Sequence, residues 1–184
     1  MTEKNYHHGD LRNALIETGI ELINEKGIRR FSLRGVAAKC GVSHTAPYAH
    51  FKDMDELLRA MSEHVATRFV QMLQAAIEGR ENQIDVITSI GKAYITFFME
   101  HPNYFQFLFY SSGMTIDLDD EHSGNYPPFA LFRDAAYRSF QKAGLPPETQ
   151  KQILIAKWAL VHGIAAMATS KYIKYSGDWR ELLR

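Results

Sequence analysis

Apolar residues recur every three or four positions along almost the whole chain of 184 residues, and this spacing limits the possible folds most strongly. Such a period places apolar side chains on one face of an α-helix, whereas half-buried strands need strict alternation, for which we find no useful length. The period predicts helices at about 11–26, 33–40, 54–79, 82–100, 103–111, 127–143, 148–173 and 178–183. We therefore expect an all-α protein.

The predicted helices differ along the chain in length and in the residues at their ends. Ser32 and Asp53 are suited to N-capping, and Gly27 and Gly41 to ending a helix. Before residue 52 the helices are short, and after it they are longer and more apolar. We expect an N-terminal domain over residues 1–52 and a helical bundle over residues 53–184, interrupted by an acidic loop at about 112–126.

Composition and charge indicate the cellular compartment of the chain and the class of its partner. It is 46% hydrophobic and 23% charged, as in ordinary globular proteins. No run of about 18 apolar residues predicts a membrane span, the first residues lack a signal-peptide core, and the single cysteine fits a reducing compartment. These features predict a cytoplasmic protein with no membrane partner. Residues 1–52 carry eight Lys/Arg and five Asp/Glu, a weak indication of a polyanionic partner.

The stretch from Ser32 to Phe51 has the pattern of a helix-turn-helix. Gly41 permits the tight turn, and the positions where two crossing helices touch carry small or apolar residues: Val36, Ala37, Cys40, Val42 and Phe51. The second helix would then be short, with His44, Thr45 and Tyr48 facing outward. This is the arrangement in which a second helix enters the DNA major groove, although any helical hairpin in a bundle shares the pattern.

Three basic residues surround this predicted reading helix. Arg34 lies in the first turn of the supporting helix, Lys52 just after the reading helix, and Lys4 in the arm before the first helix. Such positions suit contacts with DNA phosphates. Ser43 and His50, which flank the outward residues, complete the candidate set for DNA contact.

Pro47 lies inside the predicted reading helix, where its missing N–H cannot bond the carbonyl of Ser43. A proline also disfavours helical geometry at the preceding residue, Ala46. We therefore expect a distorted or 3₁₀ first turn, or a helix that begins nearer Ala46. Pro47 and Phe51 are four residues apart, so both should point inward, away from His44 and Tyr48.

The segment SLRGVAAKCGVSHTAPYAHFKDMDELLRAM resembles the DNA-binding module of TetR-family transcriptional regulators. The resemblance rests on Ser32, Arg34, Val36-Ala37, Gly41-Val42-Ser43, Tyr48 and Phe51-Lys52, followed by a capped long helix. The inward position of Pro47 usually carries a larger apolar residue in that family, so the chain departs from the common pattern there. YHHGDLR and KWALVHGIAAMA resemble a subgroup whose C-terminal domain is named for a Trp-His-Gly motif, here Trp158, His162 and Gly163.

The resemblance implies a homodimer with two DNA-reading heads and a helical, ligand-sensing body. Such a dimer would repress transcription by binding a palindromic operator. His44, Thr45 and Tyr48 would then face double-stranded DNA, and Arg34 and Lys52 would hold phosphates. The helices at about 127–143 and 148–173 are more apolar than one buried stripe requires, so we expect them to form the dimer interface as a four-helix bundle.

Residues 94–110 contain eight aromatic residues in seventeen positions. They can form the core of the bundle, or some can line a cavity for a small effector that is itself apolar or aromatic. Candidate ligand-contacting residues are Met72, Tyr94, Phe98, Phe105, Phe109, Trp158 and His162. His162 lies in an otherwise apolar helix, where a structural hydrogen bond and a ligand contact are both open.

Two other classes of function compete with a DNA-binding regulator. An all-α enzyme or small-molecule carrier would use the same aromatic cavity, but we find no catalytic pairing, metal-ligand spacing or phosphate loop, and we expect no cofactor and no catalytic residue. Cys40 can be a redox sensor or a small buried hydrophobic side chain, and its place on the packing side of its helix favours the second.

Overall fold

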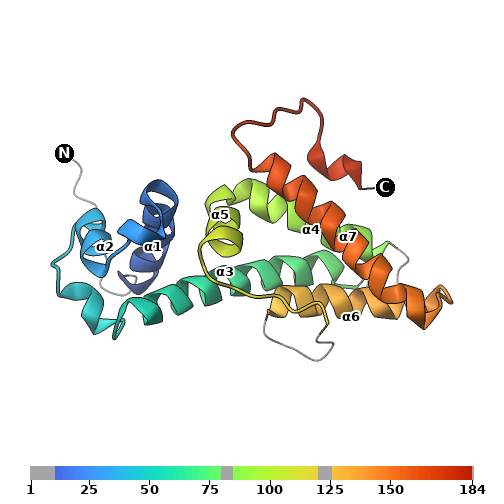
Figure 1. Cartoon of the computed structure of the whole chain (residues 1–184), viewed down its shortest axis with the longest axis horizontal. Helices are drawn as coiled ribbons and strands as arrows, with labels where there is room; N and C mark the ends of the chain where they lie inside the picture. The colour runs from blue at the N-terminus through green and yellow to red at the C-terminus, as the bar shows by residue number, and fades with distance from the viewer. Residues whose placement is uncertain (1–10, 80–84, 120–125, 184) are drawn as a thin grey trace. The chain divides into compact units, whose positions relative to one another are not determined.

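The computed structural model describes residues 11–79, 85–119 and 126–183, and in these ranges all regular structure is helical (Figure 1). This confirms the predicted all-α class. The elements in chain order are α1 (Leu11–Lys26), η1 (Ile28–Arg30), α2 (Leu33–Cys40), η2 (Ala46–Ala49), α3 (Met54–Ile77), α4 (Val86–Glu100), α5 (Pro102–Tyr110), α6 (Pro127–Lys142), α7 (Pro147–Ala168) and η3 (Trp179–Leu182). The η elements are short 3₁₀ helices.

The chain forms two compact units. The first contains residues 1–65 and 106–114, and the second contains residues 66–105 and 115–184. Helix α3 therefore contributes its first half to one unit and its second half to the other. The sequence-based domain boundary at residue 52 stays a prediction.

The first unit has a small apolar core between α1, α2 and the start of α3. Helices α1 and α2 pack on each other, and the side chains that fill the core are Leu15, Ile16, Ile20, Val36, Ala37, Phe51, Leu57 and Met61. Cys40 is buried here, with Sγ 3.7 Å from the carbonyl oxygen of Ala14. Cys40 thus occupies the position expected of a small packed side chain.

Helix α3 begins where the sequence places a cap. The Asp53 carboxylate accepts a hydrogen bond from the N–H of Glu56 at 2.8 Å, and the Glu56 carboxylate accepts one from the N–H of Lys52 at 2.6 Å. The first bond satisfies a backbone donor that the first turn of a helix leaves open, and the second satisfies the N–H of Lys52, just before the cap. It also fixes the backbone of Lys52 directly after η2.

The second unit is a bundle in which α4 packs against α6 and α7, α6 packs against α7, and η3 packs on α4. Aromatic side chains dominate its core. Phe69 of α3 lies with its ring centroid 4.7 Å from Phe97, 4.9 Å from Phe98 and 5.1 Å from Tyr94. Phe98 also contacts Phe105 at 5.2 Å. Most of the predicted aromatic cluster is therefore filled core.

Helix α7 ends earlier than predicted, at Ala168 instead of about residue 173. The Thr169 hydroxyl donates to the carbonyl oxygen of Ala165 at 2.9 Å, and the Ser170 hydroxyl accepts from the N–H of Tyr172 at 3.2 Å. Such side-chain bonds compete with the helical pattern and favour a turn. The predicted start of the helix at about 82–100 lies outside the described residues. None of the described helices combines the length and the apolar character that crossing a membrane requires.

Candidate nucleic-acid interface and aromatic cavity

The turn after α2 has the geometry predicted for a helix-turn-helix. Ser32 caps α2 by accepting a hydrogen bond from the N–H of Gly35 at 3.1 Å. Gly41 ends α2 with φ +72° and ψ 27°, a left-handed conformation that glycine adopts without strain. The N–H of Val42 then reaches back to the carbonyl oxygen of Ala37 at 3.0 Å, which completes a Schellman-type end.

The predicted reading helix is a single 3₁₀ segment, η2, that begins at Ala46. The carbonyl oxygen of Ser43 accepts from the N–H of Ala46 at 3.0 Å, because Pro47, one residue further on, has no N–H for an α-helical bond. Pro47 is buried, as is Phe51, and the Arg12 guanidinium lies 5.3 Å from the centre of the Phe51 ring. Both sequence-based expectations for Pro47 are confirmed: the helical turn is 3₁₀ and begins at Ala46, and the proline side chain is buried.

The opposite face of η2 and the turn before it are exposed. Tyr48 keeps 57% of its surface accessible, and Ser43, His44 and Thr45 are also exposed. The hydroxyls of Ser43 and Thr45 lie 3.1 Å apart and form a hydrogen bond. His50 is half-buried, with its ring centroid 6.4 Å from that of Phe51. The exposed polar groups therefore come from residues 43–48, and His50 contributes less surface.

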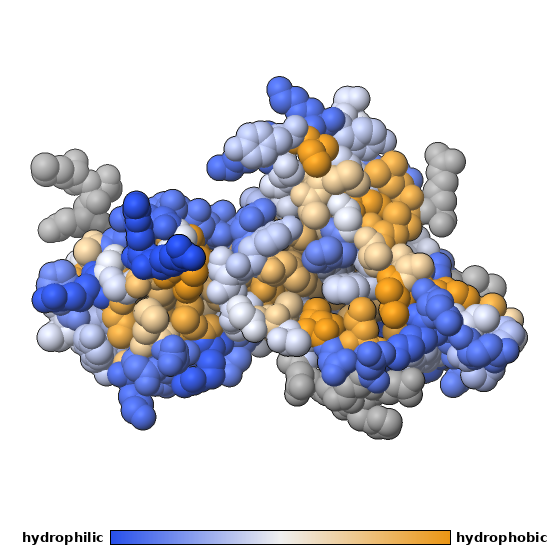
Figure 2. All heavy atoms as spheres, viewed as in Figure 1, coloured by the Kyte–Doolittle hydropathy of each residue, from blue (hydrophilic) through white to orange (hydrophobic). Residues whose placement is uncertain are grey.

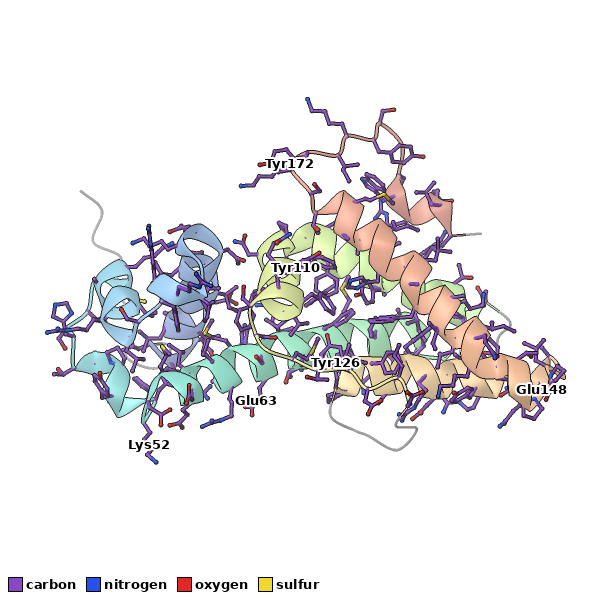
Figure 3. The ribbon with its side chains drawn as sticks, viewed as in Figure 1. Lys52, Glu63, Tyr110, Tyr126, Glu148 and Tyr172 are labelled. Atoms are coloured by element: carbon purple, nitrogen blue, oxygen red, sulfur yellow. The ribbon has the colours of Figure 1, made fainter. Side chains whose placement is uncertain are left out.

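Two of the three predicted phosphate-contacting residues are exposed in the first unit. Arg34 is exposed in the first turn of α2. Lys52 lies before α3, and its side chain extends away from the chain (Figure 3). Within the part of the chain that the structure describes, neither side chain forms an ion pair. Lys39 differs, because its Nζ lies 2.6 Å from Glu25 and 3.2 Å from Glu21, and the hydrogen bond that Lys39 donates to Glu25 raises the pKa of Lys39. Lys4 lies outside the described residues.

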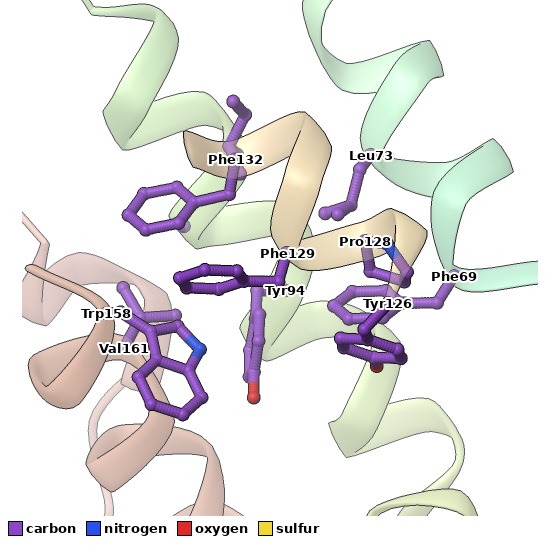
Figure 4. A pocket seen from close by; sticks show the side chains of 11 residues that line it. Phe69, Leu73, Tyr94, Tyr126, Pro128, Phe129, Phe132, Trp158 and Val161 are labelled. Atoms are coloured by element: carbon purple, nitrogen blue, oxygen red, sulfur yellow. The ribbon is translucent and has the colours of Figure 1, made fainter. Parts of the chain in front are cut away.

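A cavity of about 20 Å³ lies in the second unit between α3, α4, α6 and α7 (Figure 4). This volume is room for roughly one water molecule. The described residues of its walls are almost wholly apolar or aromatic and none is charged: Phe69, Leu73, Ile90, Gly91, Tyr94, Tyr126, Pro128, Phe129, Phe132, Trp158 and Val161. A small apolar molecule is the class of ligand that such walls favour.

Two of the seven predicted ligand-contacting residues, Tyr94 and Trp158, line this cavity. Phe98 and Phe105 are fully buried in the aromatic core and do not line it. Met72 is half-buried on α3 outside the lining, and Phe109 belongs to the first unit. The structure thus brings together only part of the predicted set.

His162 lies behind the cavity wall rather than on it. Its Nδ1 and the hydroxyl of Tyr94 are 2.9 Å apart in a hydrogen bond, and its ring centroid is 5.3 Å from that of Trp158. Burial lowers the pKa of His162 and raises the pKa of Tyr94, because it disfavours the charged form of each. A neutral pair therefore orients the Tyr94 ring, and a direct ligand contact by His162 stays a prediction.

The sequence reasoning missed Tyr126, Phe129 and Phe132, which bring the start of α6 to the cavity. Tyr126 is only 8% exposed, and its hydroxyl has no hydrogen-bond partner in the described structure. Burial raises the pKa of Tyr126 far above its ordinary value, so the hydroxyl stays protonated. No sequence signal marks Tyr126, which ends a stretch with the composition of a loop.

Comparisons with known proteins agree with this geometry. Residues 15–61 match the family described as "Bacterial regulatory proteins, tetR family", and residues 87–184 match "Tetracyclin repressor-like, C-terminal domain". The chain is also similar to a solved protein of unknown function from Rhodococcus sp. RHA1, with 26% identity, 98% and 93% of the two chains covered, and a TM-score of 0.70.

Two further solved structures share the fold at lower identity. A TetR family transcription regulator from Marinobacter aquaeolei VT8 has 15% identity and a TM-score of 0.72, with 95% of this chain and 92% of that chain covered. The fatty acid degradation regulator FadR from Bacillus halodurans has 13% identity and a TM-score of 0.69, with 97% and 93% covered.

Proposed function

This chain belongs to the TetR family of bacterial transcription regulators, and we propose that it is a homodimeric, effector-responsive repressor of a palindromic DNA operator. The observation that carries the proposal is the exposed polar face of residues 43–48, together with the exposed side chains of Arg34 and Lys52, which form no ion pair within the described ranges. A folded core behind that face holds it in place through Pro47 and Phe51. The family favours this function over the alternative of an all-α enzyme or small-molecule carrier.

The proposed DNA-contacting residues of the first unit have two roles. Tyr48, Thr45 and His44 contact base edges, because they are exposed on the face opposite Pro47. Arg34 and Lys52 contact phosphates, which sets the register of the head on the duplex without carrying sequence information. Ser43 is held by its bond to Thr45, so it orients the Thr45 hydroxyl in addition to any DNA contact.

The dimer interface would lie on α6 and α7. Phe129, Phe132 and Phe140 are buried within one chain, but the outer face of α7 keeps an apolar stripe at helical spacing: Ile153, Ala156, Leu160, Gly163 and Met167. Leu160 is 55% exposed, and a side chain added at Gly163 would meet open space. Hydrophobic residues also gather over α7 on the face that Figure 2 shows. Burying this stripe against a second copy would remove it from water.

Effector control would come from the cavity in the second unit. We extend the family assignment to the Trp-His-Gly type subgroup, on Trp158, His162 and Gly163, of which Trp158 lines the cavity. An apolar or aromatic effector that binds better to a conformation with poor DNA affinity shifts the protein toward that conformation. The shift is limited by the difference between its affinities for the two states.

The test is selection from a random duplex pool at a stated salt concentration. The wild-type protein should enrich an inverted repeat. A Thr45→Ala/Tyr48→Ala variant should fold with an unchanged melting temperature, since both side chains are exposed, and should enrich no sequence while retaining weak nonspecific binding. Equal enrichment by both proteins would show that residues 43–48 do not read DNA.

A further inference from the structure

We propose that the effector is a neutral, mainly apolar molecule with one hydrogen-bond acceptor, and that the hydroxyl of Tyr126 donates to this acceptor inside the cavity. The inference rests on the proposed effector-binding function and adds the chemistry of the ligand and the residue that recognises it.

The first support is the state of the Tyr126 hydroxyl. It is buried, it lies on a side chain that lines the cavity, and no described group accepts or donates a hydrogen bond to it. A buried hydroxyl without a partner destabilises the protein, because it has lost its hydrogen bonds to water. A bound ligand that supplies an acceptor removes this penalty, whereas a ligand without an acceptor leaves it in place. The site should therefore bind ligands with an acceptor more tightly.

The second support is the uneven distribution of polar groups around the cavity. Figure 4 shows the hydroxyls of Tyr94 and Tyr126 directed toward the same side, whereas Leu73 and Phe132 lie on the other. The Tyr94 hydroxyl already pairs with His162. Among the described lining residues, the Tyr126 hydroxyl is thus a fully buried polar group whose hydrogen bond is open, and it calls for a polar atom on the ligand.

The third support concerns charge. The described lining contains no Asp, Glu, Lys or Arg, and its Tyr94 is hydrogen-bonded to His162. Burial holds both neutral, since it raises the pKa of the tyrosine and lowers that of the histidine. A carboxylate or ammonium group would enter without a counter-charge, which is strongly unfavourable in an apolar site. The ligand is therefore uncharged.

The small size of the cavity means that ligand binding must change the conformation of its walls. Its volume of about 20 Å³ is too small for an aromatic molecule, so side chains of the wall must move when one binds. The first two turns of α6 supply Pro128, Phe129 and Phe132 to that wall, next to Tyr126. Binding of the ligand beside Tyr126 would then displace the start of α6.

Calorimetry on the full-length protein with three small probes tests the proposal. Benzyl alcohol and ethylbenzene have nearly the same shape but differ in the hydroxyl, and benzoate adds a charge. Tyr126→Phe should weaken binding of benzyl alcohol about tenfold and leave ethylbenzene within about twofold, as expected for loss of one buried hydrogen bond. Benzoate should bind the wild-type protein more weakly than benzyl alcohol.

A matched pair of variants separates recognition from folding. Without ligand, Tyr126→Phe should leave the melting temperature unchanged or higher, because it removes an unpaired hydroxyl. Tyr94→Phe should lower it, because it breaks the bond to His162.

Three results would overturn the inference alone: equal effects of Tyr126→Phe on both neutral probes, a lower melting temperature of that variant without ligand, or tightest binding of benzoate. Failure of all three probes to bind the wild-type protein would instead overturn the effector function of the cavity itself.

Discussion

Replacing Lys52 by alanine should change how the DNA affinity of this regulator depends on salt. The Lys52 side chain extends away from the protein and forms no ion pair in the described part of the chain, while its backbone N–H bonds Glu56 at 2.6 Å. Alanine keeps that backbone bond, so the cap of α3 and the melting temperature should be preserved. The variant should lose one phosphate contact from each subunit.

The size of the effect follows from counterion release. Each neutralised phosphate contributes about 0.9 to the slope of log K against log salt, so a dimer that loses two contacts should have a slope smaller by about 1.8. Between 50 and 200 mM salt, the affinity of the wild-type protein should then fall about 12-fold more than that of the variant. Fluorescence anisotropy with a labelled duplex at four or five salt concentrations measures both slopes.

Lys39 supplies the matched control. It carries the same charge on α2, but its Nζ is held by Glu25 and Glu21 at 2.6 and 3.2 Å. Lys39→Ala should therefore leave the salt slope unchanged. The phosphate role of Lys52 is refuted if Lys52→Ala leaves the slope and affinity as they are, or if Lys39→Ala lowers the slope equally.

Three other substitutions test the structure of the two units. Gly41→Ala should lower the free energy of unfolding by about 1–2 kcal/mol in urea titrations, because alanine is strained at φ +72°; no loss would mean that this turn differs in solution. Phe98→Ala should cost about 3–5 kcal/mol in the same assay, since Phe98 is fully buried, and a selective loss of effector response at unchanged stability would contradict its place in the core. Stability should fall as the pH drops below about 6.5, since the pKa of His162 is lowered in the folded state and the unfolded state then binds more protons. His162→Gln should flatten the dependence of melting temperature on pH between 7 and 5, and an unchanged profile would argue against this role.

The head could be predicted from sequence because its signals are local. Ser32, Gly41 and Asp53 each act on a backbone group within five residues, so their chemistry shows directly in the sequence. Pro47 is a stronger case, since its missing N–H and its effect on Ala46 predict a distorted or 3₁₀ turn, or a start nearer Ala46, in place of a regular reading helix. The exposed face of residues 43–48 was predicted from the four-residue spacing of Pro47 and Phe51, which places both side chains on the inner side.

The cavity could not be predicted in the same way. Helix α4 is apolar around most of its surface, so its sequence does not say which aromatic residue meets a cavity and which meets another helix. Tyr94 and Phe98 differ by one turn, yet only Tyr94 lines the cavity. Tyr126 ends the loop-like stretch before α6, and only tertiary packing brings it to the cavity. The end of α7 was placed too late because the bonds of Thr169 and Ser170 compete with helical bonds that propensity favours.

The central claim is that two copies of this chain present two reading faces to one palindromic duplex. Hydroxyl-radical footprinting of the complex with the selected operator tests it most directly. The account predicts two protected windows of equal strength, symmetric about the centre of the site, with half-sites one helical turn apart, roughly 34–36 Å. A single asymmetric window, or protection that does not depend on the sequence of the duplex, would contradict it.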